Sequence, residues 1–307
     1  MSNPLVSIVM NCFNGQRFLE RSLKSIISQK YENFELIFWD NLSKDESEKI
    51  FRQFKDQRFK YFKPTTHKTL YEARNDALKE CNGEYISFLD TDDYWLENRL
   101  SLQVPLMEQN KKVGLIYGNY IKYNENKIFF KKKKLKTGDF KSGMIFNHLI
   151  KNYNIGLLTV LIRKRFMKDD LQYFDTKYNL LSDFDYILRF SKKHSLDFVK
   201  NCIAVYHQHE NQLQSKFVSN QAQQFESWFE KKVKADKIFD ENFNENYDFQ
   251  NIKKKIRFLK FVSKLKKNKS LYEFMELLKY PNNIDKIKLF LIFFLPNEIN
   301  KRLFSLT

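Results

Sequence analysis

Apolar runs alternate with helix-like patterns along the first part of the chain. Runs typical of buried strands occur at 5–10 (LVSIVM), 34–40 (FELIFWD), 58–63 (RFKYFK) and 84–90 (EYISFLD). Between them, helical patterns occupy 16–29, about 43–55 and 70–81. The order β-α-β-α-β-α-β predicts an α/β fold with a doubly wound, mostly parallel sheet and helices on both faces.

The first two helices carry signals for where they begin. Asn14 and Gly15 form the turn before the first helix. One face of that helix holds Phe18, Leu19, Ser22, Leu23, Ile26 and Ile27. Ser43 and Glu46 have the spacing of a capping box, which predicts the start of the second helix.

The pattern changes after residue 95. Helices are expected at about 96–110 and at 182–194, and strands at 114–123, 127–133, 157–165 and 197–207, the first two of which form a hairpin. We expect a catalytic domain at 1–218, with a nucleotide-binding half at about 1–95 and an acceptor half at about 96–218. A basic helical region at 219–307 follows.

Composition narrows the class of protein. The 307 residues are 42% hydrophobic and include 31 Phe, which is enough for a large core. Three cysteines without metal-like spacing favour a reducing compartment. The N-terminus lacks the pattern of a signal peptide, and the longest apolar run, at 289–295, is too short to span a bilayer. We therefore expect a cytoplasmic protein.

The formal net charge of +17 is unevenly distributed, with +6 in residues 122–141 and +7 in residues 220–307. Such segments attract nucleic acid, anionic lipid or phosphorylated substrates, although a lysine-rich proteome explains the same bias. Residues 284–295 predict a short helix that ends before Pro296. This helix either lies in an anionic membrane interface, which would make the enzyme peripheral to the cytoplasmic membrane, or packs on the catalytic domain or a second subunit.

Polar residues follow three of the predicted strands. They are Asn11 to Asn14, Asp40 with Asn41, and Asp90 to Asp93. Ligands bind at the carboxyl ends of the strands in such sheets, so we expect these residues to form one site. The chain has neither a Gly-x-Gly-x-x-Gly after the first strand nor a P-loop, which disfavours a dinucleotide cofactor and an ATPase.

The segment EYISFLDTDDYW at 84–95 places three carboxylates at the end of an apolar strand. Carboxylates this close repel each other, and a divalent cation between them offsets the repulsion. Oxygen ligands suit Mg²⁺ or Mn²⁺, which would bridge the phosphate oxygens of a substrate. The competing interpretation of Asp90-x-Asp92-Asp93 is a solvated acidic turn before the next helix.

Four stretches together resemble the family 2 glycosyltransferases of the GT-A fold. They occur in the family's order over roughly residues 4–215, as VSIVMNCFNGQRFLERSLKSIISQKYENFELIFWDNLSKDES, ARNDALKECNGEYISFLDTDDYW, SDFDYILRF and YHQHENQLQS. Four departures from the family pattern weaken any assignment of the nucleotide. Asn11-Cys12-Phe13-Asn14 replaces Pro-x-Tyr-Asn, Asp40-Asn41-Leu42-Ser43 replaces Asp-Asp-Gly-Ser, Ser182 replaces the usual Glu, and Lys68-Thr69 stand near the position of the usual Gly.

The resemblance implies a role for each matching residue. Asn14, Asp40, Arg74, Asp90 and Asp92 would bind the nucleotide, with Asp40 at the base. Metal ligands would come from Asp92, Asp93 and His209. Asp183 would be the catalytic base.

Two of these assignments have rivals in the sequence. Asp185 is the rival of Asp183, which could also be a helix N-cap. His207 is the rival of His209. Tyr94 and Trp95 fit a core or sugar-stacking role better than a catalytic one.

These observations favour an inverting, metal-dependent transferase that moves a sugar from a nucleotide-diphosphate donor, expected to be a UDP-sugar, to a glycan or lipid-linked acceptor in envelope polysaccharide synthesis. Such a reaction needs a Lewis acid for the leaving diphosphate and one base for the acceptor hydroxyl. Two alternatives are a sugar-phosphate nucleotidyltransferase, for which NCFNGQRF is a poor glycine-rich loop, and a basic nucleic-acid-binding protein, which leaves the carboxylates unexplained.

Overall fold

The computed structural model of the chain describes residues 3–125, 133–135, 139–168, 172–209, 218–231, 250–267 and 275. The chain divides into two compact units. The first comprises residues 1–123, 133–149 and 153–207, and the second comprises residues 124–132, 150–152 and 208–307. The carboxylates of the expected site all lie in the first unit, whereas His209 lies in the second.

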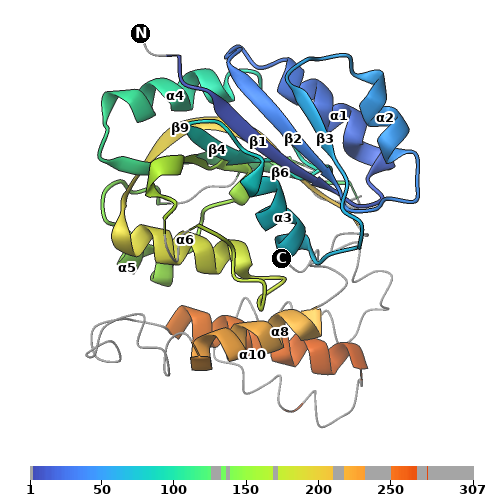
Figure 1. Cartoon of the computed structure of the whole chain (residues 1–307). Helices are drawn as coiled ribbons and strands as arrows, with labels where there is room; N and C mark the ends of the chain where they lie inside the picture. Colours follow the sequence, from blue (N-terminus) through green and yellow to red (C-terminus); the bar gives the residue numbers. More distant parts are fainter. Residues whose placement is uncertain are drawn as a thin grey trace. The chain divides into compact units, whose positions relative to one another are not determined.

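The first half of the sheet is parallel, as the sequence predicts (Figure 1). Its strands stand in the order β3 (Phe59–Phe62), β2 (Phe34–Asp40), β1 (Val6–Cys12) and β4 (Tyr85–Phe88). They alternate along the chain with α1 (Gln16–Ile27), α2 (Ser47–Gln53) and α3 (Leu70–Lys79). The register places Cys12 opposite Asp40, so the ends of β1 and β2 meet at one edge of the sheet.

Beyond β4 the sheet becomes antiparallel. It continues through β8 (Leu161–Arg163), β6 (Val113–Asn124), β9 (Ser195–Gln208) and β5 (Tyr94–Trp95). The strand predicted at 157–165 is only three residues long, because 3₁₀ turns at Leu157–Thr159 and Lys164–Phe166 flank it. β7 (Lys133–Leu135) pairs antiparallel with β6, but Tyr123 stands opposite Lys133, so the described second strand begins later than the predicted 127–133; residues 126–132 lie outside the described part of the chain.

Helices cover both faces of this sheet (Figure 1). The side chains of Val6, Ile8 and Met10 alternate along β1 and pack in one core with α1 and α4 (Arg99–Gln109). On the other face, the Phe174 ring lies 5.2 Å from Tyr71 of α3 and 4.7 Å from Tyr186 of α6 (Ser182–Lys193). This packing fixes the start of α6 on the face of the sheet that α3 covers.

The predicted capping box at Ser43 and Glu46 is wrong. Helix α2 begins at Ser47 with Glu46 as its N-cap residue. The Ser43 hydroxyl instead accepts the N–H of Asn14 (3.0 Å), a partner distant in sequence. A capping box occurs at the start of α3, where the Glu72 carboxylate accepts the N–H of Thr69 (2.8 Å).

A buried carboxylate joins the strands at the opposite, amino-terminal side of the sheet. Glu35 on β2 accepts the Ser7 hydroxyl at 2.5 Å, the Asn82 N–H at 2.7 Å and the Lys60 ammonium at 2.7 Å. Burial alone would raise the pKa of Glu35, but these donors outweigh it, and its pKa is lowered. Glu35 therefore stabilises the sheet as an ionised group.

The second unit contains α8 (Val218–Trp228) and α10 (Gln250–Lys267), which pack against each other. The buried face of α10 consists of Ile252, Ile256, Leu259 and Val262. Lys253, Lys254, Arg257 and Lys260 are exposed. The helix predicted at 284–295 lies outside the described residues. Among the helices that the structure describes, none is both long and apolar enough to cross a bilayer.

Candidate active site

The turns that follow β1 and β2 are joined by hydrogen bonds between them. Asn14, which has a φ of 52°, donates its N–H to Ser43 Oγ (3.0 Å) and accepts the Lys44 N–H on Oδ1 (2.8 Å). The Gly15 N–H donates to Ser47 Oγ (2.9 Å), and the Gln16 N–H donates to an Asp45 carboxylate oxygen (2.9 Å). Asn14 lies at the sheet edge where the sequence places it, and its side chain holds the neighbouring turn.

Asp40 lies beneath these turns and is fully buried. Its Oδ1 accepts the Ser43 N–H (2.8 Å), and its Oδ2 accepts the Tyr61 hydroxyl (2.6 Å). Each oxygen can accept a second bond, but because Asp40 is fully buried, a contact with a base requires the turn above it to move. Next to it, Asn41 forms two bonds with the backbone of Lys68, at 2.7 and 3.1 Å.

Arg74 and Asp90 form an ion pair, which the sequence does not reveal. Arg74 Nη2 lies 2.5 Å from Asp90 Oδ1. Arg74 is almost completely buried beneath the rings of Tyr71 and Phe88, whereas the Asp90 side chain is 44% exposed. Arg74 thus supplies positive charge that offsets the repulsion within the acid cluster of Asp90, Asp92 and Asp93.

The three carboxylates of the cluster have different surroundings. Although the Asp90 side chain is 44% exposed, the surrounding protein limits hydration of its carboxyl group and so raises its pKa; the charge of Arg74 opposes this shift and that of Asp92 reinforces it. Burial also raises the pKa of Asp93, which is only 2% exposed, and the charges of Asp92 and Asp90 add to this. Asp93 Oδ1 accepts the N–H of His207 on β9 (2.8 Å). Asp93 therefore faces inward, toward β9.

Side chains of helix α1 bond to main-chain atoms of residues 90–93, which we call the acidic loop. The sequence did not predict these bonds. Arg21 Nη2 donates to the carbonyl of Asp92 (2.5 Å). Ser22 Oγ donates to the carbonyls of Thr91 (2.7 Å) and Asp93. The signal in the sequence was Ser22, a polar residue on the apolar face of the first helix. These bonds fix the backbone that carries the carboxylates.

Asp183 and its rival Asp185 occupy different environments on α6. Leu181 is the N-cap residue, so Asp183 does not cap the helix. Asp183 is partly exposed and accepts the Phe184 N–H on Oδ1 (2.8 Å). Asp185 is 1% exposed, and its carboxylate forms an ion pair with Arg189 Nε at 2.8 Å.

Asp183 is electrostatically coupled to the acid cluster. After burial and Asp92, its charge contributes to raising the pKa of Asp90. It also contributes, after burial, to raising the pKa of Tyr71 and of Tyr153. The charge of Asp183 thus acts on a carboxyl group 93 positions earlier in the sequence.

The two histidines near the end of β9 differ in position. The His207 ring is buried, stacked on Tyr123 at 5.2 Å, and its Nδ1 lies 3.1 Å from Arg21 Nη2. His209 follows β9 and belongs to the second unit. Among the residues that the structure describes, no three His, Cys, Asp or Glu side chains are grouped so that they could hold a metal ion.

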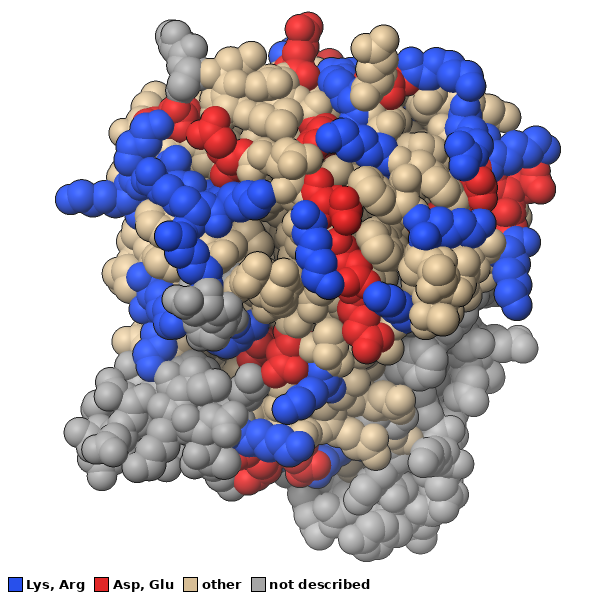
Figure 2. Space-filling view, viewed as in Figure 1, with Lys and Arg blue, Asp and Glu red and all other residues tan. Residues whose placement is uncertain are grey.

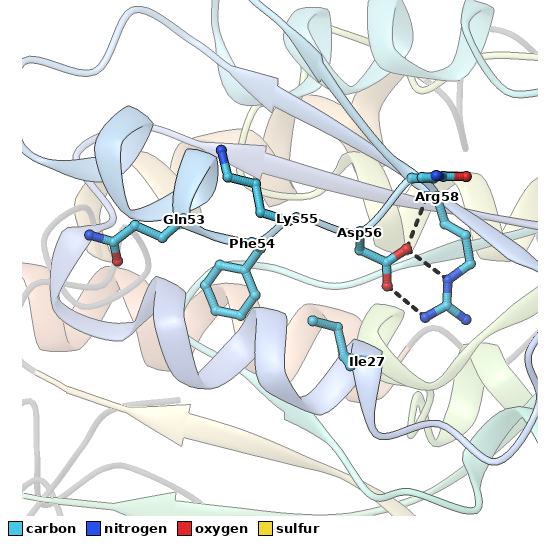
Figure 3. Close-up of a pocket in the computed structure, with 7 residues that line it drawn as sticks. Ile27, Gln53, Phe54, Lys55, Asp56 and Arg58 are labelled. Carbon is cyan, nitrogen blue, oxygen red and sulfur yellow. Dashed lines mark hydrogen bonds and ion pairs between the residues drawn. The ribbon is translucent and has the colours of Figure 1, made fainter.

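A pocket of about 650 Å³ lies at the amino-terminal side of β3 (Figure 3). It is lined by Ile27 of α1 and by residues 53–58, in which the Arg58 guanidinium lies 2.6 Å from an Asp56 oxygen. Because the carboxylates follow the opposite ends of the strands, this pocket is separate from the candidate active site.

A mixed sheet with acidic residues at the carboxyl ends of its parallel strands is the arrangement of the GT-A fold, and solved structures agree. The fold is similar to that of Staphylococcus aureus TarS 1–349 in complex with UDP-GlcNAc, with a TM-score of 0.58, 13% identity and coverage of 97% of this chain and 89% of that one. It is also similar to the mannosyltransferase PcManGT from Pyrobaculum calidifontis in complex with GDP-Man and Mn²⁺, with a TM-score of 0.57, 14% identity and coverage of 100% and 89%.

Residues 7–173, more than half of the chain, match the model of glycosyl transferase family 2, and the chain belongs to that family. Two similar relatives are the Escherichia coli UDP-Glc:alpha-D-GlcNAc-diphosphoundecaprenol beta-1,3-glucosyltransferases WfgD and WfaP. WfgD is 36% identical over 164 residues, 53% of this chain and 61% of its own length. WfaP is 35% identical over 167 residues, which are 54% of this chain and 63% of its own length. The chain therefore spans less than two thirds of either relative.

Proposed function

We propose that the protein is an inverting glycosyltransferase that moves a sugar from a UDP-sugar to a glycan or lipid-linked acceptor. The observation that carries the proposal is the position of Asp183, a partly exposed base candidate near the start of α6. Helix α6 packs through Phe174 beside α3, whose Arg74 holds Asp90 of the acid cluster at 90–93. One base and one site for the leaving diphosphate are what a single displacement needs.

In this mechanism Asp183 accepts the proton of the acceptor hydroxyl as that oxygen attacks the anomeric carbon of the donor. The bond from this carbon to the diphosphate breaks on the opposite face, so the configuration is inverted. Asp185 is a poorer base, because it is buried and its charge is paired with Arg189. Neither step needs a covalent nucleophile from the protein.

We propose Mg²⁺ or Mn²⁺ as the cofactor, with Asp92 as its ligand in the first unit; the resemblance adds Asp93 and His209. Because the described residues contain no ready group of three ligands, oxygens of the donor diphosphate would complete the coordination. The partly exposed carboxylate of Asp92 provides the kind of oxygen donor that these ions prefer. Asp93 fits less directly, because it is buried and one of its oxygens accepts the His207 N–H. When bound, the cation would neutralise charge on the departing diphosphate.

The nucleotide is proposed to bind against the joined turns at Asn14 and Asp40, with Arg74 and Asp90 beside it. Phe13, which sequence reasoning did not single out, is 50% exposed at the end of β1, and its ring meets that of His67 edge-on at 4.5 Å. An exposed aromatic ring at this edge can stack on a nucleobase. Asp40 is fully buried, so it would contact the base only after the turn above it moved.

Binding of nucleotide-sugars tests the proposed function. We expect UDP-glucose with Mn²⁺ to raise the melting temperature above that found with Mn²⁺ alone, and GDP-mannose to do so less. Transfer to a lipid-linked N-acetylglucosaminyl diphosphate, the kind of acceptor named for WfgD, should follow with the matching donor. Absence of binding by every nucleotide-sugar would contradict the proposal.

We also propose that α10 contributes to binding an anionic membrane surface. On the face in Figure 2, blue and red residues interleave over much of the surface. Ion pairs in the first unit, such as Lys63 with Glu48 (2.9 Å), reduce the local charge. Helix α10 has eight Lys or Arg and no Asp or Glu, and its apolar face already packs against α8. The lipid-linked acceptor of the proposed reaction would lie in such a membrane.

Flotation with vesicles tests this interaction. Each cation contributes about 1 kcal/mol at an anionic surface, so Lys254→Gln with Arg257→Gln should lower partitioning into phosphatidylglycerol vesicles about 30-fold. The control replaces Lys112 and Lys200 with Gln, since both are exposed residues of the first unit. Equal flotation of the two variants, or binding to DNA in place of vesicles, would contradict the assignment.

A further inference from the structure

We propose that Arg21 is a positioning residue that ties the acidic loop to the end of β9 and so sets the geometry at which donor and metal bind. The proposal rests on the proposed function for its consequence in catalysis. Its structural part rests only on contacts within the first unit.

The Arg21 guanidinium is held between aromatic rings. It lies 5.3 Å from the centroid of Phe18, one turn earlier on α1, and 4.6 Å from that of Tyr94, directly after the acidic loop. Cations are attracted to such ring faces, and the rings restrict the positions that the guanidinium can adopt. The Arg21 guanidinium is thus held by one ring from α1 and by another that directly follows the acidic loop.

One nitrogen of Arg21 then bridges two segments that are 115 positions apart in the sequence. Nη2 donates to the Asp92 carbonyl (2.5 Å) and lies 3.1 Å from His207 Nδ1. A guanidinium has only donors, so His207 Nδ1 must be the acceptor of this bond. The N–H of His207 in turn donates to Asp93 Oδ1 (2.8 Å). Arg21 and His207 therefore close a ring of hydrogen bonds through the acidic loop.

Other residues of α1 support the same region. Ser22 donates to the carbonyls of Thr91 and Asp93, and Ser25 Oγ accepts the N–H of Trp95 on β5 (3.1 Å). The Phe18 ring meets the His207 ring edge-on at 4.7 Å. Arg21 forms hydrogen bonds both to the loop and to His207 of β9. A change at Arg21 should therefore disturb the loop and β9 together.

The substitution Arg21→Gln tests the proposal, with Arg21→Lys as the conservative variant and Lys24→Gln as the control. Lys24 lies on the same helix, is exposed and pairs with Glu20. In hydrogen exchange of the metal-free protein, Arg21→Gln should lower protection about tenfold or more in peptides covering 90–97 and 203–208, because a bond to a charged group is lost. Lys24→Gln should leave both peptides unchanged.

Ligand binding gives the second readout. By calorimetry, Arg21→Gln should weaken binding of UDP with Mn²⁺ about tenfold, with Arg21→Lys in between, because lysine keeps the charge and lacks the planar fork. Unchanged protection in either peptide, or a loss of melting temperature with unchanged UDP–Mn²⁺ affinity, overturns the proposal. If the unmodified protein binds no nucleotide, the proposed function fails, and the exchange experiment alone decides the role of Arg21.

Discussion

Asp183→Asn is expected to lower the rate of sugar transfer by about two orders of magnitude or more, while donor binding is retained. Asparagine has nearly the same shape and keeps an oxygen for the Phe184 N–H, but it cannot take the proton of the acceptor. Because Asp183 is partly exposed and no ion pair involving it is recorded among the described residues, the free energy of unfolding should change by less than about 0.5 kcal/mol.

Asp185→Asn provides the matched comparison. It removes the charge partner of Arg189 in a buried pair, which should lower the free energy of unfolding by about 3 kcal/mol or more. Asp183→Asn should therefore lower the rate of transfer, whereas Asp185→Asn should lower the stability of the protein. A stable, inactive Asp185→Asn beside an active Asp183→Asn would move the base to Asp185. Retained configuration in the product, seen by NMR, would rule out a single displacement.

Removal of divalent metal is expected to abolish transfer. Treatment with EDTA should lower the rate by about two orders of magnitude or more, and Mn²⁺ or Mg²⁺ should restore it, because the departing diphosphate loses its main source of positive charge. Asp92→Ala should have the same effect at saturating metal, with little change in melting temperature. Full activity in EDTA would exclude the metal from the reaction.

Asp93→Asn separates two roles within the acid cluster. Asparagine at this position can still accept the His207 N–H but is a weaker metal ligand than a carboxylate. If Asp93 binds the metal, the variant should need more Mn²⁺ for half-maximal activity. If Asp93 only positions β9, its Mn²⁺ requirement should match that of the unmodified protein.

The parallel half of the sheet was predictable because its signals are local. Apolar runs and turn residues identify β1 to β4, and strand ends in such a sheet meet at one edge. The capping box at Ser43 failed because a partner distant in sequence, the Asn14 N–H, takes the hydroxyl. A pattern of neighbouring residues does not reveal a hydrogen-bond partner that lies far away in the sequence.

The contacts that organise the site were less predictable. Arg21, Ser22 and Ser25 bind main-chain atoms of the acidic loop and of Trp95, and any sequence supplies a carbonyl or an N–H, so no residue pattern marks these partners. The Arg74–Asp90 pair joins two residues that were each assigned to the nucleotide. The sequence indicated which chemical groups are present, but not which of them are bound to other groups of the protein.

The bonds between the turns after β1 and β2 bear on the thermodynamics of nucleotide binding. Asn14, Gly15 and Gln16 are held by hydrogen bonds to residues 43–47 of the protein itself. Ordering a side chain at an interface costs about 0.5–1.5 kcal/mol, and a surface held in this way avoids much of that entropy loss. The turns after β1 and β2 should then select nucleotides by the shape of the base. A base of the wrong outline would have to break an existing bond, and its rejection would appear as a loss of binding enthalpy.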